Sequence, residues 1–265
     1  MRTSTIFLLL FGGLLLGSGC GGSSSRQERP LLLATAANVQ YAMEDLRLAF
    51  EAETGIPCEL VISSSGKLTA QIIQGAPYDL LVSANMLYPQ TLVERGMAAD
   101  TPRVYALGAL VLWTLKEMDL DAGLAFLRRP GGGKIALPNP QNAPYGAEAI
   151  HALEHYDLLE EAADRLVYGE SIAQANQYIM SRACEVGFTA KSTVLSPRFR
   201  DTGRWVEVNA EAYQPIRQGV VITTYGARYH SSQSRRFLQF LFSEEAQAVL
   251  ERYGYRIPKA VKSGT

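Results

Sequence analysis

Short apolar runs alternate with segments of helical periodicity along most of this chain. Residues 31–35, 60–62 and 80–83 are apolar runs that predict buried strands, and 42–50, 68–74 and 89–95 place apolar residues at helical spacing. Gly55 and Gly96 follow two of these segments and are expected to end the helices. Such alternation indicates a mostly parallel sheet with helices on both faces. The first part of the chain is therefore expected to form an α/β lobe.

A second alternating series follows. The apolar run 104–115 is too long for a simple central strand and predicts a passage from one lobe into another. Helices are expected near 122–127, 146–154, 158–166 and 173–182, strands at 135–137 and 186–189, a returning strand at 219–224, and two closing helices between 234 and 253. We expect an α/β, two-lobed fold with a double crossover hinge. One lobe comprises 31–107 plus 218–265, and the other comprises 108–217.

The first thirty residues predict export. Arg2 precedes an apolar run at 6–16, which is about half of the roughly 20 residues that span a bilayer, so 1–19 is interpreted as a signal peptide. The small residues 17–19 and Cys20 resemble the lipobox of bacterial lipoproteins, although Gly17 stands where a large aliphatic residue is usual. This resemblance implies lipidation at Cys20, a flexible tether over 20–30 and an extracytoplasmic, membrane-anchored location. An ordinary cleaved secretory signal is the alternative.

Charge and cysteine content narrow the classes of partner. The 265 residues are 47 % hydrophobic and carry 25 basic and 26 acidic side chains, so the net charge is −1. Such a balance offers no surplus to neutralise nucleic-acid phosphates, and nucleic acid is excluded as a partner. Apart from Cys20, only Cys58 and Cys184 remain, which form no metal-ligand pattern. A single disulfide between these two cysteines is one possibility. The preferred interpretation is that both are buried free thiols in different lobes.

Four strand-to-helix corners are candidate binding positions, because ligands of open α/β sheets bind where helices begin and offer free backbone N–H groups. Asn38 follows the first strand, and three serines with a glycine at 63–66 precede a helix. The proline-rich turn 138–146 exposes the N–H groups of Tyr145 and Gly146, and 169–172 opens a later helix. Each corner also has a purely structural explanation, as a helix cap or a turn.

One motif points to different chemistry. His151, Glu154 and His155 match the H-x-x-E-H pattern of one zinc-peptidase group, with Glu160 or Glu161 available as a third ligand. The surrounding acidic residues favour a solvated helix face instead. The sequence contains no G-x-S-x-G elbow and no phosphate-binding glycine loop. The chain is therefore not expected to be an enzyme, and no cofactor is expected.

These segments together resemble the extracytoplasmic molybdate-binding (ModA-type) proteins of ABC importers over about 31–258. The resemblance is carried by A-T-A-A-N-V at 34–39, S-S-S-G-K-L at 63–68, G-A-P-Y-D-L-L-V-S-A-N at 75–85, P-Y-G at 144–146, E-S-I at 170–172, V-G-F-T-A at 186–190 and R-Y-G-Y at 252–255. It implies ligand-binding positions at Asn38, Ser65, Tyr145 and Ile172, with Ser64, Gly66 and Gly146 beside them. Some members place a tyrosine hydroxyl at the position of Ala190, which alanine cannot supply.

The resemblance also implies a two-lobed, periplasmic-binding-protein-like fold and a function. The chain is expected to capture molybdate, and tungstate as well, between its lobes and to deliver it, as a monomer, to an ABC permease with its ATPase. A tetrahedral dianion can be held without lysine or arginine when N–H and O–H groups converge at helix N-termini. Sulfate or another small anion is the alternative ligand, a sensor is the alternative partner, and the zinc hydrolase is the distant alternative.

Overall fold

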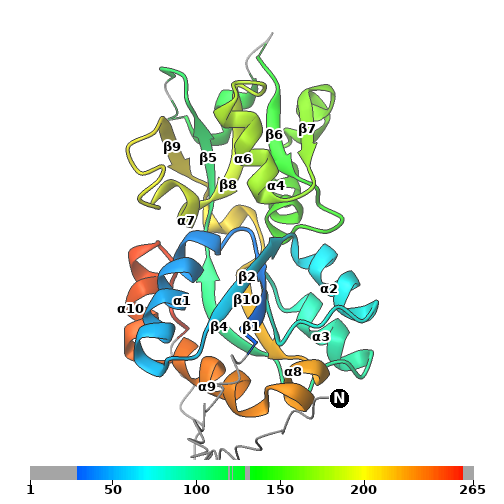
Figure 1. Cartoon of the computed structure of the whole chain (residues 1–265). Helices are drawn as coiled ribbons and strands as arrows, with labels where there is room; N and C mark the ends of the chain where they lie inside the picture. Colours follow the sequence, from blue (N-terminus) through cyan, green and yellow to red (C-terminus); the bar gives the residue numbers. More distant parts are fainter. Residues whose placement is uncertain (1–28, 119, 121, 129–131, 259–265) are drawn as a thin grey trace, which may run out of the picture.

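Two lobes stacked end to end make up the molecule (Figure 1). The computed structural model describes residues 29–118, 120, 122–128 and 132–258. The predicted signal peptide 1–19, Cys20 and the tether up to residue 28 lie outside the described residues. Each lobe is built on a five-stranded sheet. The two-lobed α/β fold predicted from the sequence is confirmed.

The sheet of the first lobe is mixed. Its strands are β1 (Leu31–Ala36), β2 (Cys58–Ser63), β3 (Leu80–Ser83), β4 (Arg103–Gly108) and β10 (Ile216–Ile222), in the order β2-β1-β3-β10-β4. The pairings β1–β2 and β1–β3 are parallel, whereas β10 is antiparallel to both β3 and β4. Four of the five strands therefore run in one direction, and the expectation of a mostly parallel sheet is confirmed with β10 as its exception. β10 enters from the second lobe and runs opposite to its neighbours.

Helices cover both faces of this sheet. They are α1 (Gln40–Thr54), α2 (Ser65–Ile73), α3 (Leu87–Glu94), α8 (Thr224–Tyr229), α9 (Ser231–Leu241) and α10 (Glu244–Arg252). Leu33, Val82 and Val220 pack with α1, α9 and α10, and their sequence neighbours Ala34, Leu81 and Val221 pack with α2 and α3. Successive strand residues point to opposite faces, so a strand covered on both sides is apolar at every position.

The sheet of the second lobe repeats this plan. It contains β5 (Leu110–Thr114), β6 (Ile135–Pro138), β7 (Leu166–Gly169), β8 (Val186–Ala190) and β9 (Arg204–Glu207) in the order β7-β6-β8-β5-β9. Its helices are α4 (Pro144–His155), α5 (Leu159–Ala162), α6 (Ile172–Met180) and α7 (Lys191–Val194). Here β5 is the antiparallel insert, paired with β8 and β9. Both sheets thus place three parallel strands beside one strand of opposite direction.

Two predicted segments differ from the structure, and three short elements were not predicted. The helix expected over 158–166 is only α5 followed by a 3₁₀ turn at Ala163–Arg165, after which the chain forms strand β7. The segment near 122–127 is a 3₁₀ helix at Gly123–Arg128. The strand β9 and the short helices α7 and α8 were not predicted. Short elements are decided by tertiary packing more than by local pattern.

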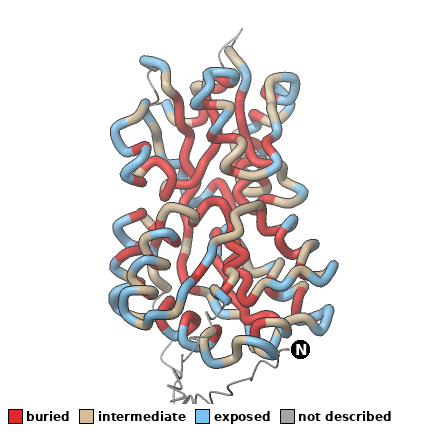
Figure 2. Tube along the Cα trace, in the orientation of Figure 1, coloured by how far each residue is buried: buried red, intermediate tan, exposed pale blue. Residues whose placement is uncertain are grey.

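The lobes are joined by two crossings. Ala109 alone separates β4 from β5, so the apolar run 104–115 is divided between the two sheets, and residues 208–215 carry the chain back to β10. Buried residues run through the centre of each lobe and across the junction (Figure 2). The predicted lobe boundaries at 107/108 and 217/218 lie within two residues of these strand ends. The division of the chain into two lobes that move as separate rigid bodies stays a prediction.

The cysteines and the helix lengths bear on two further expectations. Cys58 and Cys184 are both buried and free, so the bridge considered between them is absent and the free-thiol interpretation is confirmed. Among the described residues, no helix has the length and apolar character needed to cross a bilayer.

Candidate ligand-binding site between the lobes

A small cavity lies between the two lobes. Its volume is about 10 Å³, and it is lined by Ala36, Ala37, Asn38, Ser64, Ser65, Ala84, Ala143, Pro144, Tyr145 and Ile172. Six of these residues come from the first lobe and four from the second. Pockets for drug-sized ligands occupy roughly 300–1,000 Å³, so this cavity suits a much smaller ligand. All four main predicted ligand-binding residues line it.

Four helices begin at this cavity. α1 and α2 follow β1 and β2 in the first lobe, and α4 and α6 follow β6 and β7 in the second. β1 and β6 are each the second strand of their sheets, and β2 and β7 are the edge strands beside them. The sequence therefore places equivalent corners of the two lobes opposite each other. Helix N-termini carry partial positive charge and unpaired N–H groups, so this arrangement suits an anion.

The backbone donors divide into two groups. Within the described residues, the N–H groups of Asn38, Ser65, Tyr145 and Ile172 have no hydrogen-bond acceptor. The N–H of Gly66 donates to Asn142 O at 3.0 Å, and the N–H of Gly146 donates to Ala143 O at 2.8 Å. The two glycines predicted as flanking positions therefore have their donors occupied. The four main positions keep theirs free.

Serine hydroxyls add further donors. Ser65 Oγ accepts the N–H of Ala84 at 3.0 Å, and this bond orients the hydroxyl while leaving its proton available. The Ser65 side chain is 1 % exposed. Ser64 Oγ is also buried and has no partner among the described residues. By contrast, Ser171 Oγ caps α6 by accepting from the N–H of Gln174. The interpretation of Ser171 as a helix cap is therefore confirmed.

The side chain of Asn38 is turned toward protein partners. Its Nδ2 donates to Gln218 Oε1 at 2.8 Å and to the hydroxyl of Tyr255 at 3.0 Å. Both amide hydrogens are thereby used, and the backbone N–H is the free donor of this residue. Sequence reasoning identified Asn38 but missed Gln218 and Tyr255, which lie 180 and 217 residues away in the chain.

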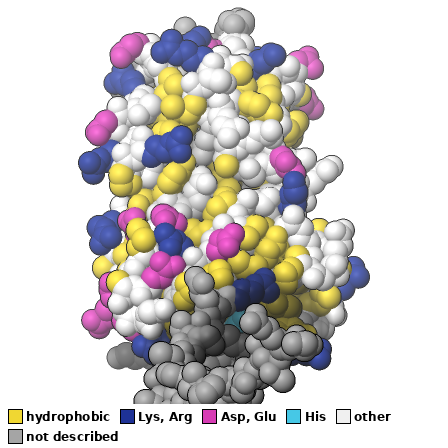
Figure 3. All heavy atoms as spheres, viewed as in Figure 1, with side chains coloured by type: hydrophobic (Ala, Val, Ile, Leu, Met, Phe, Trp, Pro, Cys, Tyr) yellow, Lys and Arg dark blue, Asp and Glu magenta, His cyan; other side chains and the backbone are white. Residues whose placement is uncertain are grey.

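The cavity is electrically neutral. None of its lining residues carries a formal charge. Burial raises the pKa of Tyr145 well above its ordinary value, so its hydroxyl stays protonated. Lys67 follows the serine-rich corner at 63–66 in the sequence. It forms an ion pair with Glu170 of the other lobe at 2.5 Å, and both side chains are about half exposed. Basic and acidic side chains are interspersed over the visible face without a large single-sign patch (Figure 3).

The residues of the zinc motif lie elsewhere, on α4. His151 Nδ1 is 2.9 Å from Glu148, the imidazole is 47 % exposed, and His155 packs against the ring of Tyr156. Glu161 lies 3.7 Å from Arg128. Among the described residues, no group of three or more His, Cys, Asp or Glu is placed to hold a metal ion. Ala190 ends β8, is fully buried and does not line the cavity.

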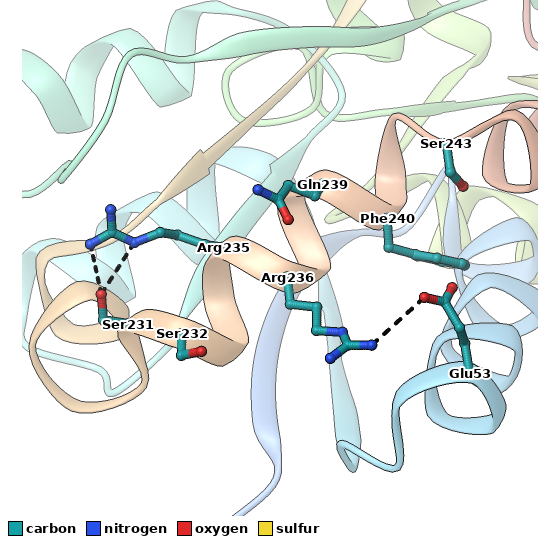
Figure 4. A pocket seen from close by; sticks show the side chains of 8 residues that line it. All are labelled: Glu53, Ser231, Ser232, Arg235, Arg236, Gln239, Phe240 and Ser243. Atoms are coloured by element: carbon teal, nitrogen blue, oxygen red, sulfur yellow. Dashed lines mark hydrogen bonds and ion pairs between the residues drawn. The ribbon is translucent and has the colours of Figure 1, made fainter.

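A wider hollow lies on the first lobe between α9 and the end of α1 (Figure 4). Arg235 donates to Ser231 on the same helix, and Arg236 lies 3.9 Å from Glu53. Its lining comes from the first lobe alone and includes none of the residues predicted to bind a ligand. The cavity between the lobes is therefore the candidate site.

Comparison with known proteins agrees with this geometry. The model of the bacterial extracellular solute-binding protein family matches residues 31–256. The molybdate-binding protein ModA of Azotobacter vinelandii is 34 % identical over 241 residues, which cover 91 % of this chain and 94 % of that protein. The chain belongs to the ModA family of bacterial extracellular solute-binding proteins. Members of this family are non-enzymatic binding proteins that act outside the cytoplasm.

A further relative and two solved structures are also similar to this chain. ModA of Rhodobacter capsulatus is 31 % identical over 256 residues, covering 96 % of both chains. The solved periplasmic molybdate-binding protein of Azotobacter vinelandii superimposes with a TM-score of 0.80 at 32 % identity, over 86 % of this chain and all of that one. The sulfate-binding protein SubI of Mycobacterium tuberculosis shares the fold, with a TM-score of 0.68 at 15 % identity.

Proposed function

We propose that this protein binds molybdate, and tungstate as well, as the solute-binding component of an ABC importer. The observation that carries the proposal is the set of four unpaired backbone N–H groups, two from each lobe, around one small neutral cavity. The relatives named above as molybdate-binding proteins support the choice of ligand. Asn38, Ser65, Tyr145 and Ile172 are the proposed donors.

Neutral donors suffice for a dianion in this setting. A hydrogen bond to a charged acceptor contributes about 1.5–3 kcal/mol. Four backbone N–H groups and the hydroxyls of Ser64 and Ser65 offer six such bonds, and the helix N-termini add favourable partial charge. A lysine or arginine in the cavity is not required. The N–H groups of Gly66 and Gly146 are occupied, so these two residues are not proposed as donors. They serve here by letting backbone segments approach closely.

The rest of the proposed cycle follows from the two-lobed form. Closure of the lobes, 31–107 with 218–265 against 108–217, encloses the anion away from water. The closed protein is then the form recognised by the permease and its ATPase. A lipid at Cys20, after removal of 1–19, holds the monomeric protein at the outer face of the membrane through the tether 20–30.

Thermal unfolding with a panel of anions tests the ligand. A ligand bound only by the folded state stabilises it by about 2.7 kcal/mol at a concentration 100 times its Kd, which raises the midpoint of a chain this size by roughly 5–10 °C. We expect such a rise with molybdate and tungstate. Phosphate carries a proton at neutral pH and competes for the same donors less well. A rise with sulfate alone would reassign the ligand, and no rise with molybdate, tungstate or sulfate would refute the proposal.

Transport and anchoring need separate tests. Deletion of the gene is expected to lower molybdate uptake at low external concentration, and the wild-type gene should restore it. If deletion leaves molybdate uptake unchanged, and the wild-type gene restores only a signalling response that deletion had abolished, the sensor alternative is favoured. Metabolic labelling with a fatty acid is expected to mark the wild-type chain and not a Cys20→Ser variant. Equal labelling of both would exclude the anchor at Cys20.

A further inference from the structure

A buried hydrogen-bond network surrounds Asn38 on the side away from the cavity. Ser192 Oγ donates to Asn38 O at 2.7 Å, and the hydroxyl of Tyr255 lies 3.1 Å from both Asn38 O and Ser192 Oγ. Gln218 and Tyr255 receive the amide hydrogens of Asn38. All four residues are at most 3 % exposed. The segment carrying one proposed ligand donor is thus held at both its side chain and its carbonyl.

The network joins both lobes. Asn38 precedes α1, Gln218 lies on β10 and Tyr255 follows α10, so all three belong to the first lobe. Ser192 lies on α7 and belongs to the second lobe. The Ser192–Asn38 bond therefore crosses directly between the lobes. It forms only when α7 packs against the segment that carries Asn38.

We propose that Ser192 and Tyr255 are positioning residues for ligand binding. Tyr255 holds the Asn38 segment so that its free N–H faces the cavity, and Ser192 ties that segment to the second lobe in the closed arrangement. Part of the affinity for the anion therefore arises from a bond that never touches it. This inference rests on the proposed function, because it concerns the same site.

The chain offers a matched control for each residue. Ser196 is fully buried four positions after Ser192, but its hydroxyl donates to Thr193 O within the second lobe. Tyr253 is also buried, and its hydroxyl donates to Asp45 within the first lobe. Loss of either control hydroxyl removes a hydrogen bond, buried for Ser196 and part-buried for Tyr253, that lies within one lobe. Any general cost of removing such a bond is therefore measured by Ser196→Ala and Tyr253→Phe.

The experiment measures molybdate association and dissociation rates by stopped flow for the wild type and these four single variants. Loss of one neutral hydrogen bond changes an equilibrium by roughly two- to tenfold. We expect Ser192→Ala and Tyr255→Phe to release molybdate at least fivefold faster than Ser196→Ala and Tyr253→Phe do. The association rate of Ser192→Ala should stay within twofold of the wild type, because the open form lacks the bond between Ser192 and Asn38. Unfolding midpoints without ligand should fall no further in the two test variants than in their controls.

Each other outcome overturns the inference. Equal dissociation rates in the test and control variants would leave Ser192 and Tyr255 with a purely structural role. For Ser192→Ala, a change confined to association would place the effect of Ser192 in the open form and contradict its role in the closed one. Failure of the inference can be told apart from failure of the proposed function by the wild-type rates. If the wild type does not bind molybdate, the proposed function fails, and the inference fails with it. If the wild type binds and the variants match their controls, only the inference fails.

Discussion

Ser65 shows how one side chain can be oriented by a neighbour for its proposed role. Its Oγ accepts from the N–H of Ala84, so the hydroxyl proton is directed elsewhere. The sequence pattern pointed to the serine-rich corner before a helix, and the family resemblance selected Ser65 within it. The partner that orients it is 19 residues away and follows a different strand.

At the residue scale, the first prediction is that Ser65→Ala weakens molybdate binding by roughly one to two decades, the loss of one hydrogen bond to a charged acceptor. Isothermal calorimetry measures the change. Ser234→Ala is the control, since that serine is buried in α9, outside the cavity, and its hydroxyl has no partner among the described residues. Unchanged affinity in Ser65→Ala would remove this residue from the site.

Cys58 gives a prediction on pH. Burial raises the pKa of its thiol to about 12, from an ordinary value of 9.0. The raised folded-state value means that the unfolded chain releases this proton first, so the thiol's contribution to stability is complete below about pH 9 and is lost as pH rises toward 12. We expect Cys58 to resist a thiol reagent at pH 8 in the folded chain. A variant with Cys20→Ser and Cys184→Ser isolates its signal, and rapid labelling without denaturant would contradict the assignment.

At the scale of elements, the turn before α4 depends on the absence of a side chain at residue 146. A Cβ on Gly146 would lie 2.1 Å from Pro138 O, a backbone atom that cannot swing aside. We expect Gly146→Ala to lower the free energy of unfolding by about 1–3 kcal/mol, as overpacking does, and to weaken molybdate binding by displacing the N–H of Tyr145.

The control for that turn is Ala147→Gly, the next position of the same helix. It costs about 1 kcal/mol through helix propensity but adds no atom to the turn. Chemical denaturation and calorimetry on both variants separate stability from binding. If both lose affinity in proportion to their stability, the turn has no special role in the site.

Local patterns located most elements but failed where packing decides. The spacing of Leu158, Leu159, Ala162 and Leu166 predicted one helix, yet the chain leaves the helix after Ala162 and Leu166 starts the edge strand β7. Pairing with β6 stabilises this short strand, and no local signal specifies that partner. The corner before α6 was nevertheless found, because Ser171 marks a helix start whatever precedes it.

At the scale of the whole molecule, contacts between the lobes lie around the cavity. Gly66 N–H donates to Asn142 O, and Lys67 pairs with Glu170 at the rim. These contacts describe a closed arrangement, and we expect it to be favoured by ligand. Small-angle scattering should show a smaller radius of gyration on adding molybdate to the wild type. Superimposable profiles with and without ligand would contradict closure, and Ser65→Ala should need more ligand for the same change.

The surface ion pair makes a weaker contribution. Lys67 and Glu170 are both about half exposed, and exposed pairs contribute about 0–1 kcal/mol. Lys67→Ala should therefore weaken molybdate binding by less than about fivefold, and the loss should disappear at high salt. A loss of a hundredfold or more by calorimetry would mean that Lys67 contacts the anion, contrary to its place outside the cavity lining.

Long-range connections were beyond the reach of sequence patterns. Ser192, Gln218 and Tyr255 are 154, 180 and 217 residues from Asn38. Ser192 lies on α7, Gln218 lies on β10 and Tyr255 follows α10. Nothing in their local sequence indicates that they meet. Only the return of β10 and the packing of α7 against the first lobe bring them together.

The two crossings have a consequence for how such a site can change over time. Residues 109–215 form one uninterrupted stretch that contains the whole second sheet, with Tyr145 and Ile172. Asn38 and Ser65 are encoded outside that stretch. A recombination event with two joints, one at Ala109 and one before β10, would therefore exchange half of the donors as a single cassette. The other half would be inherited unchanged, so a hybrid of two relatives would combine one set of donors from each parent.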